Sequence, residues 1–298
     1  MPSPADMQWT YTLITAAYNE QDYIEETIQS VLLQTLRPKV WLIVSDGSTD
    51  RTDEIVLRYS AKNPFIQLLR REKDANRGFA SKVFAIRAGL EHLGDIETEF
   101  IAHLDADIVL CPSYFEDVIA RCHKDPRLGI AGGWYAEKVN GSFSVVPGSS
   151  IDSVPGCMQV FRRSCYEEIG GLLPIEYGGE DWYAEVMARK AGWRVQSFPE
   201  VVVRHLRVTG TASNKLRYCF HQGVTDYCLG SHPAFEVIKV TRRMMWRPYV
   251  LGGGARLLGF LVAHVSKRRA VSDDFVAFLR REQLSRMGVL GTLLHQGI

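Results

Sequence analysis

The first hundred residues alternate short runs of apolar, often β-branched side chains with segments of helical periodicity. The runs are at residues 11–18, 40–46, 66–72 and 99–107, and each is typical of a strand. Between the first two, Ile24, Ile28 and Leu32 recur at i, i+4 and i+8, as on one face of a helix. Strands and helices that alternate at this spacing predict βαβ units, and therefore an α/β fold with a mainly parallel sheet flanked by helices.

The pattern changes after residue 127. From 128 to 174, short strands and glycine-rich turns such as AGGWYAEKVNGSFSVVPGSS predict loops and antiparallel additions over the crevice at the carboxyl ends of the parallel strands. A helix returns at 177–193, and from about residue 215 the pattern is helical. We therefore expect one α/β domain over residues 1–213 and a helical C-terminal segment over 214–298.

Composition is typical of a globular protein, with 46% hydrophobic and 23% charged residues among 298. The net charge of +1 hides an asymmetry: residues 204–298 hold 15 Lys and Arg against 5 Asp and Glu, whereas residues 1–203 hold 20 against 29. A basic tail indicates contact with an anionic surface, or else a solvated basic face. The six cysteines show no metal-binding spacing and the N-terminus shows no signal peptide, so we expect a cytoplasmic protein.

Polar or acidic residues follow all four predicted strands. They are AYNE (17–20), DGSTD (46–50), KDANRG (73–78) and DAD (105–107). In a parallel sheet, ligands bind beyond the carboxyl ends of the strands, where the strand order reverses. The pattern therefore predicts one site at this edge.

Five elements, in chain order, resemble the family 2 glycosyltransferases of the GT-A fold. They are AYNE, SDGSTD, NRGFASK, LDAD and GGEDWYAEVMARKAGW, and the resemblance covers about residues 10–205. Two positions depart from the family pattern: Ala16 stands where a proline is usual, and Ser45–Asp46 where two aspartates are usual. The resemblance implies transfer of a sugar from a nucleotide-sugar donor, with a nucleotide-binding part over 1–127 and an acceptor-binding, catalytic part over 128–213.

The diphosphate of such a donor leaves with negative charge, which a divalent cation neutralises. Mg²⁺ or Mn²⁺ prefers oxygen ligands and keeps phosphates and waters beside one or two carboxylates. Asp105 and Asp107 stand at i and i+2 of an extended segment, so both point the same way. The resemblance implies that Asp107 binds the metal and that Asp105 addresses the ribose or assists. Asp107 could instead cap a following helix, and His205 is either a further metal ligand or a structural histidine.

The end of the first two strands is expected to hold the nucleoside. Asp46 could accept a hydrogen bond from a uracil-type base, or make a turn or helix cap over GSTD. Tyr18 and Glu20 are expected to line the base and ribose, with Ala16 shaping the same pocket. The alternative for Glu20 is an acid in the first turn of a helix.

A further loop is expected to face the nucleotide. Asn76, Arg77 and Gly78 open a helix, whose N–H groups form an anion-binding terminus. Arg77 or Lys82 would add positive charge there. An ordinary capped helix start is the alternative.

The acceptor hydroxyl needs a general base. Asp181 is the candidate, because it begins a helix after Gly178–Gly179, where the positive helix end keeps a carboxylate ionised. Glu180 is the rival, and the resemblance favours the second acid of the pair. Packing and capping at the helix start is the structural alternative. One base opposite the leaving diphosphate implies a single displacement with inversion at the anomeric carbon.

The segment 249–265, YVLGGGARLLGFLVAHV, is apolar apart from Arg256 and His264. Its 17 residues fall short of the ~20 needed to span a bilayer, and a central arginine costs at least ~2.5–3.5 kcal/mol there. Basic residues flank it on both sides within 242–269. We therefore expect a helix lying in a membrane interface, with a buried core helix or a true span as alternatives.

These features together predict an inverting, metal-dependent glycosyltransferase with a UDP- or GDP-linked donor and a lipid-linked or cell-envelope polysaccharide acceptor, acting at the cytoplasmic face of the membrane. The processive signature QxxRW is absent, which favours addition of one sugar at a time. The alternatives are a nucleotide-sugar-binding or membrane-assembly protein without turnover, and a nucleotidyltransferase, although the latter would need a basic glycine-rich phosphate loop. Nucleic-acid binding is not expected, because the basic tail lacks interleaved aromatic residues.

Overall fold

The computed structural model describes residues 9–72, 78, 80–94, 96–139, 141–147, 149–208, 214–267 and 269–295. The chain divides into two compact units. The sheet unit comprises Met1–Pro174 and Glu180–Val208, and the helical unit comprises Ile175–Gly179 and Thr209–Ile298. Each unit is described below by itself.

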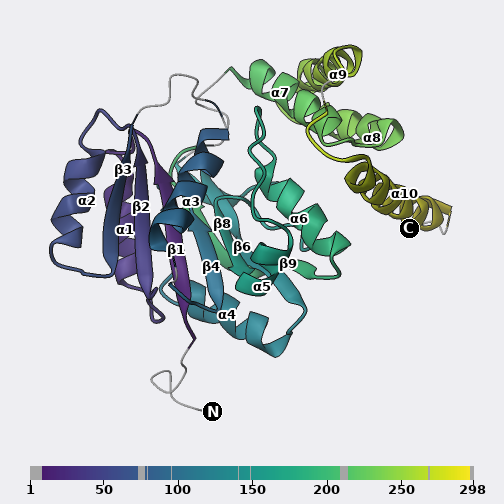
Figure 1. The fold of residues 1–298 in the computed structure, drawn as a ribbon. Helices are drawn as coiled ribbons and strands as arrows, with labels where there is room; N and C mark the ends of the chain where they lie inside the picture. Colours follow the sequence, from purple (N-terminus) through teal and green to yellow (C-terminus); the bar gives the residue numbers. More distant parts are fainter. Residues whose placement is uncertain are drawn as a thin grey trace. The chain divides into compact units, whose positions relative to one another are not determined.

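A single mixed sheet forms the centre of the sheet unit (Figure 1). Its strands are β1 (Tyr11–Ala17), β2 (Val40–Asp46), β3 (Ile66–Arg71), β4 (Phe100–Leu104), β5 (Ile108–Val109), β6 (Leu128–Val139), β7 (Ser142–Val145), β8 (Met158–Arg162) and β9 (Arg194–His205). The order is β3-β2-β1-β4-β8-β6-β9-β5, with β7 paired to β6. The first four strands are parallel, β8 runs antiparallel to β4 and β6, and β9 runs parallel to β6. The predicted α/β class with a flanked, mainly parallel sheet is confirmed.

Alternation along the strands supplies the two faces of the sheet. Tyr11 and Trp41 point into one core, and Ile14 and Leu42 point into the other. The first core contains side chains of α1 (Ile24–Leu32), α2 (Thr52–Ser60) and α4 (Tyr114–Lys124). The second contains side chains of α3 (Ala80–Leu93), α5 (Arg163–Glu168) and α6 (Glu180–Lys190). Burial on both faces explains why strands such as β2 read as continuous apolar runs.

Two predictions about the strands are corrected. The strand expected over 99–107 ends at Leu104, and the short β5 that follows pairs with β9 instead. The segment 128–139, expected to form loops and antiparallel additions, is the twelve-residue strand β6 inside the sheet, antiparallel to β7 and β8 and parallel to β9. Its glycines obscured this, yet close packing requires them: a Cβ on Gly132 would lie 2.4 Å from Val154 Cγ1, and one on Gly133 would lie 2.1 Å from Val201 O, at a register shift.

The helical unit consists of α7 (Lys215–Cys228), α8 (Pro233–Arg243), α9 (Tyr249–Val265) and α10 (Asp273–His295), together with the segment 175–179. Thr225 Oγ1 donates a hydrogen bond to the carbonyl oxygen of Tyr177, which ties that segment to α7. The helix predicted over 249–265 is confirmed. Within the described residues, no helix is both long enough and apolar enough to cross a membrane.

Candidate active site

A cavity of about 360 Å³ opens in the sheet unit at the carboxyl ends of β1, β2 and β4. β1 lies between β2 and β4, so the strand order reverses here. Open α/β sheets bind their ligands at such a point. The polar residues that follow separate strands in the sequence therefore meet around one cavity.

Nine of the residues singled out in the sequence line this cavity. They are Ala16, Tyr18, Glu20, Asp46, Gly78, Lys82, Asp105, Asp107 and Glu180. Asp181 and His205 do not line it, but each is bonded into the networks that surround it. Asn76 and Arg77 lie outside the described residues.

Two basic side chains flank the carboxylate of Asp107. Its Oδ1 lies 3.4 Å from Nε2 of His205, and its Oδ2 lies 3.6 Å from Nε of Arg207. Burial alone would raise the pKa of Asp107, but His205, Arg207 and Lys82 lower it below its ordinary value. On the far side of the imidazole, Nδ1 of His205 lies 3.5 Å from Oε1 of Glu137. Asp107 is thus ionised and oriented toward the cavity edge.

Arg207 is a cavity residue that the sequence analysis missed. It forms an ion pair with Glu20, and its guanidinium carbon lies 5.0 Å from the centre of the Tyr23 ring. Burial raises the pKa of Glu20 to about 7, although Arg207 acts in the opposite direction. A signal was present in the sequence, because Arg207 is a basic residue that follows the end of a strand, two positions after His205.

A second network joins Asp105 to Asp181 through a glycine. Nζ of Lys82 lies 2.6 Å from Oδ1 of Asp105 and donates to the carbonyl oxygen of Gly156 at 3.0 Å. The N–H of Gly156 donates to Oδ2 of Asp181 at 3.1 Å, and the N–H of Trp182 donates to Oδ1 at 2.7 Å. A Cβ at residue 156 would lie 2.8 Å from Asp181 Oδ2, so the contact requires glycine. In the sequence, only the Pro-Gly turn dipeptide marked this position.

The neighbouring acids of α6 differ in their surroundings. Burial, and then the negative charge of Asp181, raise the pKa of Glu180, which lines the cavity. Glu185 is 1% exposed and accepts a hydrogen bond from the N–H of Val154 at 2.6 Å. It therefore anchors the loop that carries Gly156.

Glu20 lies before the first turn of α1, and Asp46 and Asp107 are not the N-cap residues of α2 and α4. The residues that precede α1, α2 and α4 are Tyr23, Arg51 and Ser113. Asp46 instead accepts a hydrogen bond from Nη1 of Arg71 at 2.8 Å. All three acids line the cavity, and each is held by a basic partner.

A comparison with protein families identifies the segment that carries three of the cavity acids. Residues 12–149 match the family model "Glycosyl transferase family 2". This segment is a glycosyl transferase family 2 domain. The family inferred from the sequence motifs is thereby confirmed, and the matched residues contain Asp46, Asp105 and Asp107 of the cavity.

Curated relatives of the family 2 domain are longer than the matched region. Poly-beta-1,6-N-acetyl-D-glucosamine synthase of Staphylococcus aureus (strain MSSA476) is 32% identical over 122 residues, which cover 41% of this chain and 27% of that protein. The synthase of Staphylococcus epidermidis is 24% identical over 208 residues, which cover 63% of this chain and 46% of that protein. The chain thus spans between about a quarter and a half of the relatives it matches.

Solved structures share the fold. The mannosyltransferase PcManGT from Pyrobaculum calidifontis, in complex with GDP-Man and Mn²⁺, superposes with a TM-score of 0.55 at 21% identity, covering 98% of this chain and 83% of that one. S. aureus TarS 1–349, in complex with UDP, gives 0.53 at 17% identity, covering 80% and 72%. These matches establish the GT-A architecture of the family 2 domain.

The donor groups around the cavity fit a divalent cation. Asp107 and His205 offer a carboxylate and an imidazole 3.4 Å apart. Across the described part of the chain, no group of three or more His, Cys, Asp or Glu side chains could hold a metal ion. Mg²⁺ and Mn²⁺ are often held by one or two protein groups plus phosphate oxygens and waters, so two protein donors are compatible with binding. Asp105, the other predicted ligand, is paired with Lys82.

Proposed function

We propose that this protein is an inverting, divalent-metal-dependent glycosyltransferase that moves one sugar from a nucleotide-sugar donor to a hydroxyl of a lipid-linked or cell-envelope polysaccharide acceptor. The observation that carries the proposal is the cavity at the strand reversal, where Asp105, Asp107 and Lys82 of the family 2 domain meet Arg207, which follows β9. Two carboxylates beside two basic side chains suit a metal-bound diphosphate. The carboxylates would bind the cation, and the cation and the basic side chains would attract the phosphate oxygens.

On the donor side, Asp107 and His205 would hold Mg²⁺ or Mn²⁺. The cation would neutralise charge on the departing diphosphate. Lys82 and Arg207 are held at the cavity by acids in this structure, and we propose that they turn toward phosphate oxygens when the donor enters. Asp46, 2% exposed at the end of β2, would accept a hydrogen bond from the base.

On the acceptor side, Asp181 would remove the hydroxyl proton. Two N–H donors fix its carboxylate, and it stands in the first turn of α6, where the helix end favours negative charge. Burial raises the pKa of Glu180 to about 7, so this carboxyl is only partly ionised at neutral pH, and it stays the rival base. A base that activates the acceptor hydroxyl opposite the leaving diphosphate needs no second, nucleophilic carboxylate, and this single displacement inverts the anomeric carbon.

The acceptor class is supported by relatives named as synthases of poly-beta-1,6-N-acetyl-D-glucosamine. UDP and GDP donors are both supported, since the solved relatives are described with UDP, UDP-GlcNAc and GDP-Man. We place the reaction at the cytoplasmic face of a membrane, reached through residues 242–269.

A thermal-shift screen tests the donor and the metal together, because a ligand that binds only the native state raises the melting temperature. UDP, GDP, UDP-GlcNAc and GDP-Man are added with and without Mn²⁺. We expect one nucleotide series to stabilise the protein only with metal, and Asp107→Asn to abolish that shift. Glu54→Gln, an exposed carboxylate on α2, is the matched control and should respond as the wild type does. Stabilisation that is unaffected by Asp107→Asn contradicts the metal assignment.

Release of the nucleoside diphosphate from the donor then tests turnover. We expect Asp181→Asn to lower kcat by at least ~100-fold while nucleotide binding is retained. Tight binding without any release would instead favour a protein that binds nucleotide sugars without turnover.

A further inference from the structure

The helix α9 exposes its large apolar side chains. Seven of them are between 38% and 81% exposed within the helical unit: Val250, Leu251, Leu257, Leu258, Leu261, Val262 and Val265. They recur at the spacing of one helix face, called here the outer face of α9. Isolated exposed leucines are ordinary on protein surfaces, but an apolar face along a whole helix marks an interaction site.

The opposite face of α9 is built from small residues. Gly252, Gly253, Gly259 and Ala263 are buried with Phe260. A Cβ at residue 259 would lie 2.0 Å from the carbonyl oxygen of Phe220 on α7, so the two backbones touch there. A rotation of α9 that buried its leucines would have to push them into that contact. The exposure of the outer face is therefore imposed by the packing.

Arg256 is the one Lys, Arg, Asp or Glu residue within α9, and it faces inward. Its Nε lies 2.7 Å from Oε1 of Glu236, its Nη1 donates to Gln222 at 3.2 Å, and it forms a further ion pair with Asp226. The arginine that argued against a membrane-spanning helix thus has its charge neutralised inside the helical unit, and it leaves the outer face without a charged side chain.

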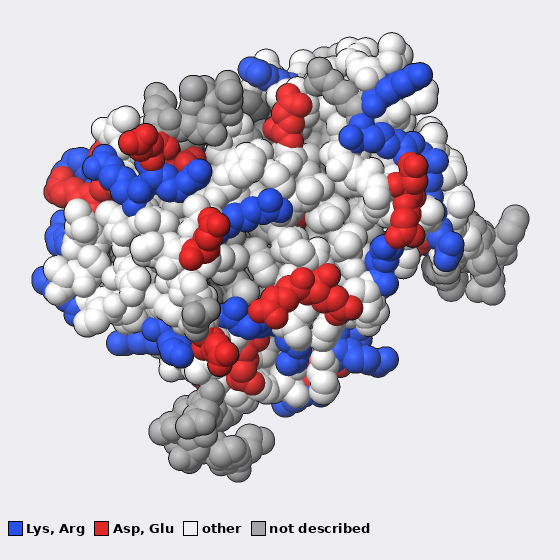
Figure 2. Space-filling view, viewed as in Figure 1, with Lys and Arg blue, Asp and Glu red and all other residues white. Residues whose placement is uncertain are grey.

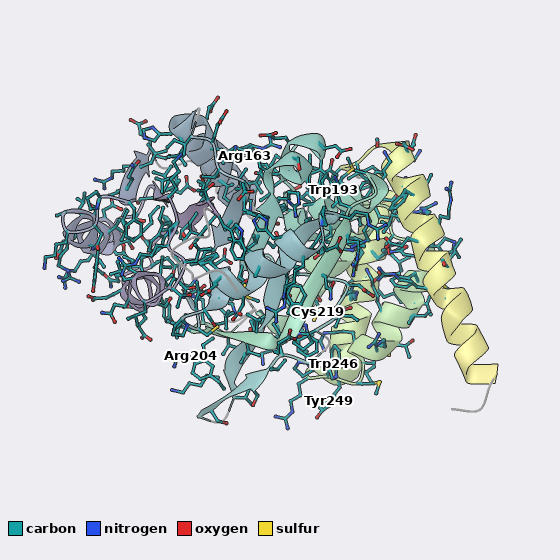
Figure 3. All side chains as sticks on the ribbon, turned by 90° about the horizontal axis from the view of Figure 1, so that it is seen from below. Arg163, Trp193, Arg204, Cys219, Trp246 and Tyr249 are labelled. Carbon is teal, nitrogen blue, oxygen red and sulfur yellow. The ribbon has the colours of Figure 1, made fainter. Side chains whose placement is uncertain are left out.

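Basic residues stand at both ends of α9. Arg242, Arg243 and Arg247 precede α9, and Lys267 and Arg269 follow it. On the face seen in Figure 2, blue side chains gather over the helical unit. Trp246 and Tyr249 are 44% and 53% exposed, and Figure 3 shows both at the rim of that unit. Cations and amphipathic aromatic rings around an apolar stripe complement anionic headgroups above acyl chains.

We propose that the outer face of α9 docks in the surface of an anionic lipid bilayer, with the helix lying in the plane of the membrane. The proposal rests on the membrane contact proposed above and assigns it to one helix face. Docking requires no change inside the helical unit, since the apolar side chains already point outward and the ends already carry the charge.

Vesicle co-flotation tests this. The full chain is mixed with phosphatidylglycerol/phosphatidylcholine vesicles and with pure phosphatidylcholine vesicles. We expect binding to the anionic vesicles to be at least ~10-fold tighter, and to weaken as salt rises, because each basic residue near the surface adds to the attraction. The double variant Leu258→Glu/Leu261→Glu should lose at least ~10-fold in affinity for those vesicles, whereas Leu57→Glu, a leucine 55% exposed on α2, should bind as the wild type does.

Three results would overturn the proposal: no preference for anionic vesicles, equal binding by the double variant, or a stable dimer in solution that the double variant converts to monomer. The last would make the outer face an interface between copies of this chain. If the double variant does not fold, brominated acyl chains provide a second measurement on other variants. They should quench tryptophan fluorescence in the wild type, and clearly less in Trp246→Phe. Nucleotide and Mn²⁺ binding, measured in parallel, should be unchanged in every variant, which separates a failure of docking from a failure of the proposed activity.

Discussion

The contact between α7 and α9 makes a sharp prediction about two glycines of one helix. A Cβ on Gly259 would lie 2.0 Å from the carbonyl oxygen of Phe220 and 2.9 Å from its carbon, whereas a Cβ on Gly254 would meet nothing within 4 Å. Real Cβ atoms essentially never approach closer than 3.0 Å, so Gly259→Ala forces the two backbones apart by about 1 Å. No flexible side chain can absorb that movement.

The magnitude follows from two opposing effects. Overpacking of this kind typically costs ~1–3 kcal/mol, and we expect the upper end because both partners are backbone. Alanine in place of glycine in a helix interior returns ~0.5–1 kcal/mol. Gly259→Ala should therefore destabilise the helical unit by ~2 kcal/mol, whereas Gly254→Ala should stabilise it by ~0.5–1 kcal/mol. The two variants differ in sign although the substitution and the helix are the same.

Urea denaturation followed by helical circular dichroism measures both variants against the wild type. The Gly259→Ala transition should move to lower urea and the Gly254→Ala transition to equal or higher urea, without a change of slope. Equal midpoints, or the reverse order, would refute the close backbone contact and with it the argument that α9 cannot turn its leucines inward. Vesicle binding should survive in Gly254→Ala, since alanine keeps the exposed side of α9 apolar.

Three further predictions concern the sheet unit. Burial raises the pKa of Glu185 from 4.5 to about 8, so the folded chain keeps a proton that the unfolded chain releases. The contribution of this group to the stability of the fold is full below about pH 4.5 and falls as the pH rises toward 8. Melting temperatures of Glu185→Gln should therefore fall less than those of the wild type across this pH range. An unchanged pH dependence would contradict the raised pKa of Glu185. His103 is 2% exposed between Phe161 and Tyr166, neither of its nitrogens is hydrogen-bonded among the described residues, and burial lowers its pKa to about 3. His103→Phe should keep or raise the melting temperature, and a loss above ~1 kcal/mol would mean that the imidazole has a partner. Arg207→Met should weaken binding of the nucleoside diphosphate at least ~10-fold by calorimetry, whereas the same change at the exposed Arg58 should not; equal affinities would remove Arg207 from the diphosphate site.

Much of the fold was predictable because local signals agreed. β2 occupies the expected residues 40–46, and β1 and β3 differ from expectation by a single residue. β1 and β2 are buried on both faces, so their apolar runs are continuous and easily read, whereas β3 lies at the edge of the sheet and is partly exposed. The length of β6 and its place inside the sheet were not predicted, because the glycines that its neighbours require ordinarily disfavour a strand.

The site, too, contains residues that the sequence revealed and residues that it did not. Asp46, Asp105 and Asp107 were visible because acids are conspicuous at the ends of apolar strands. Gly156 was not visible, since its role is to let Asp181 approach within 3.1 Å of its N–H, and nothing local records that approach. Arg207 was hidden for a related reason, because its partner Glu20 is 187 positions away in the chain.

The sequence by itself determined the alternation of strands and helices, the acidic strand ends, the family motifs and the apolar, base-flanked segment at 249–265. These are properties of residue order, spacing and composition, which hold before any long-range contact forms. Only the tertiary structure decided which acid meets which base, that Asp105 pairs with Lys82 while Asp107 lies against His205 and Arg207, and that Arg256 is neutralised inward while the leucines of α9 face out. Such choices depend on backbone approach and on desolvation, and both are set by partners remote in the chain.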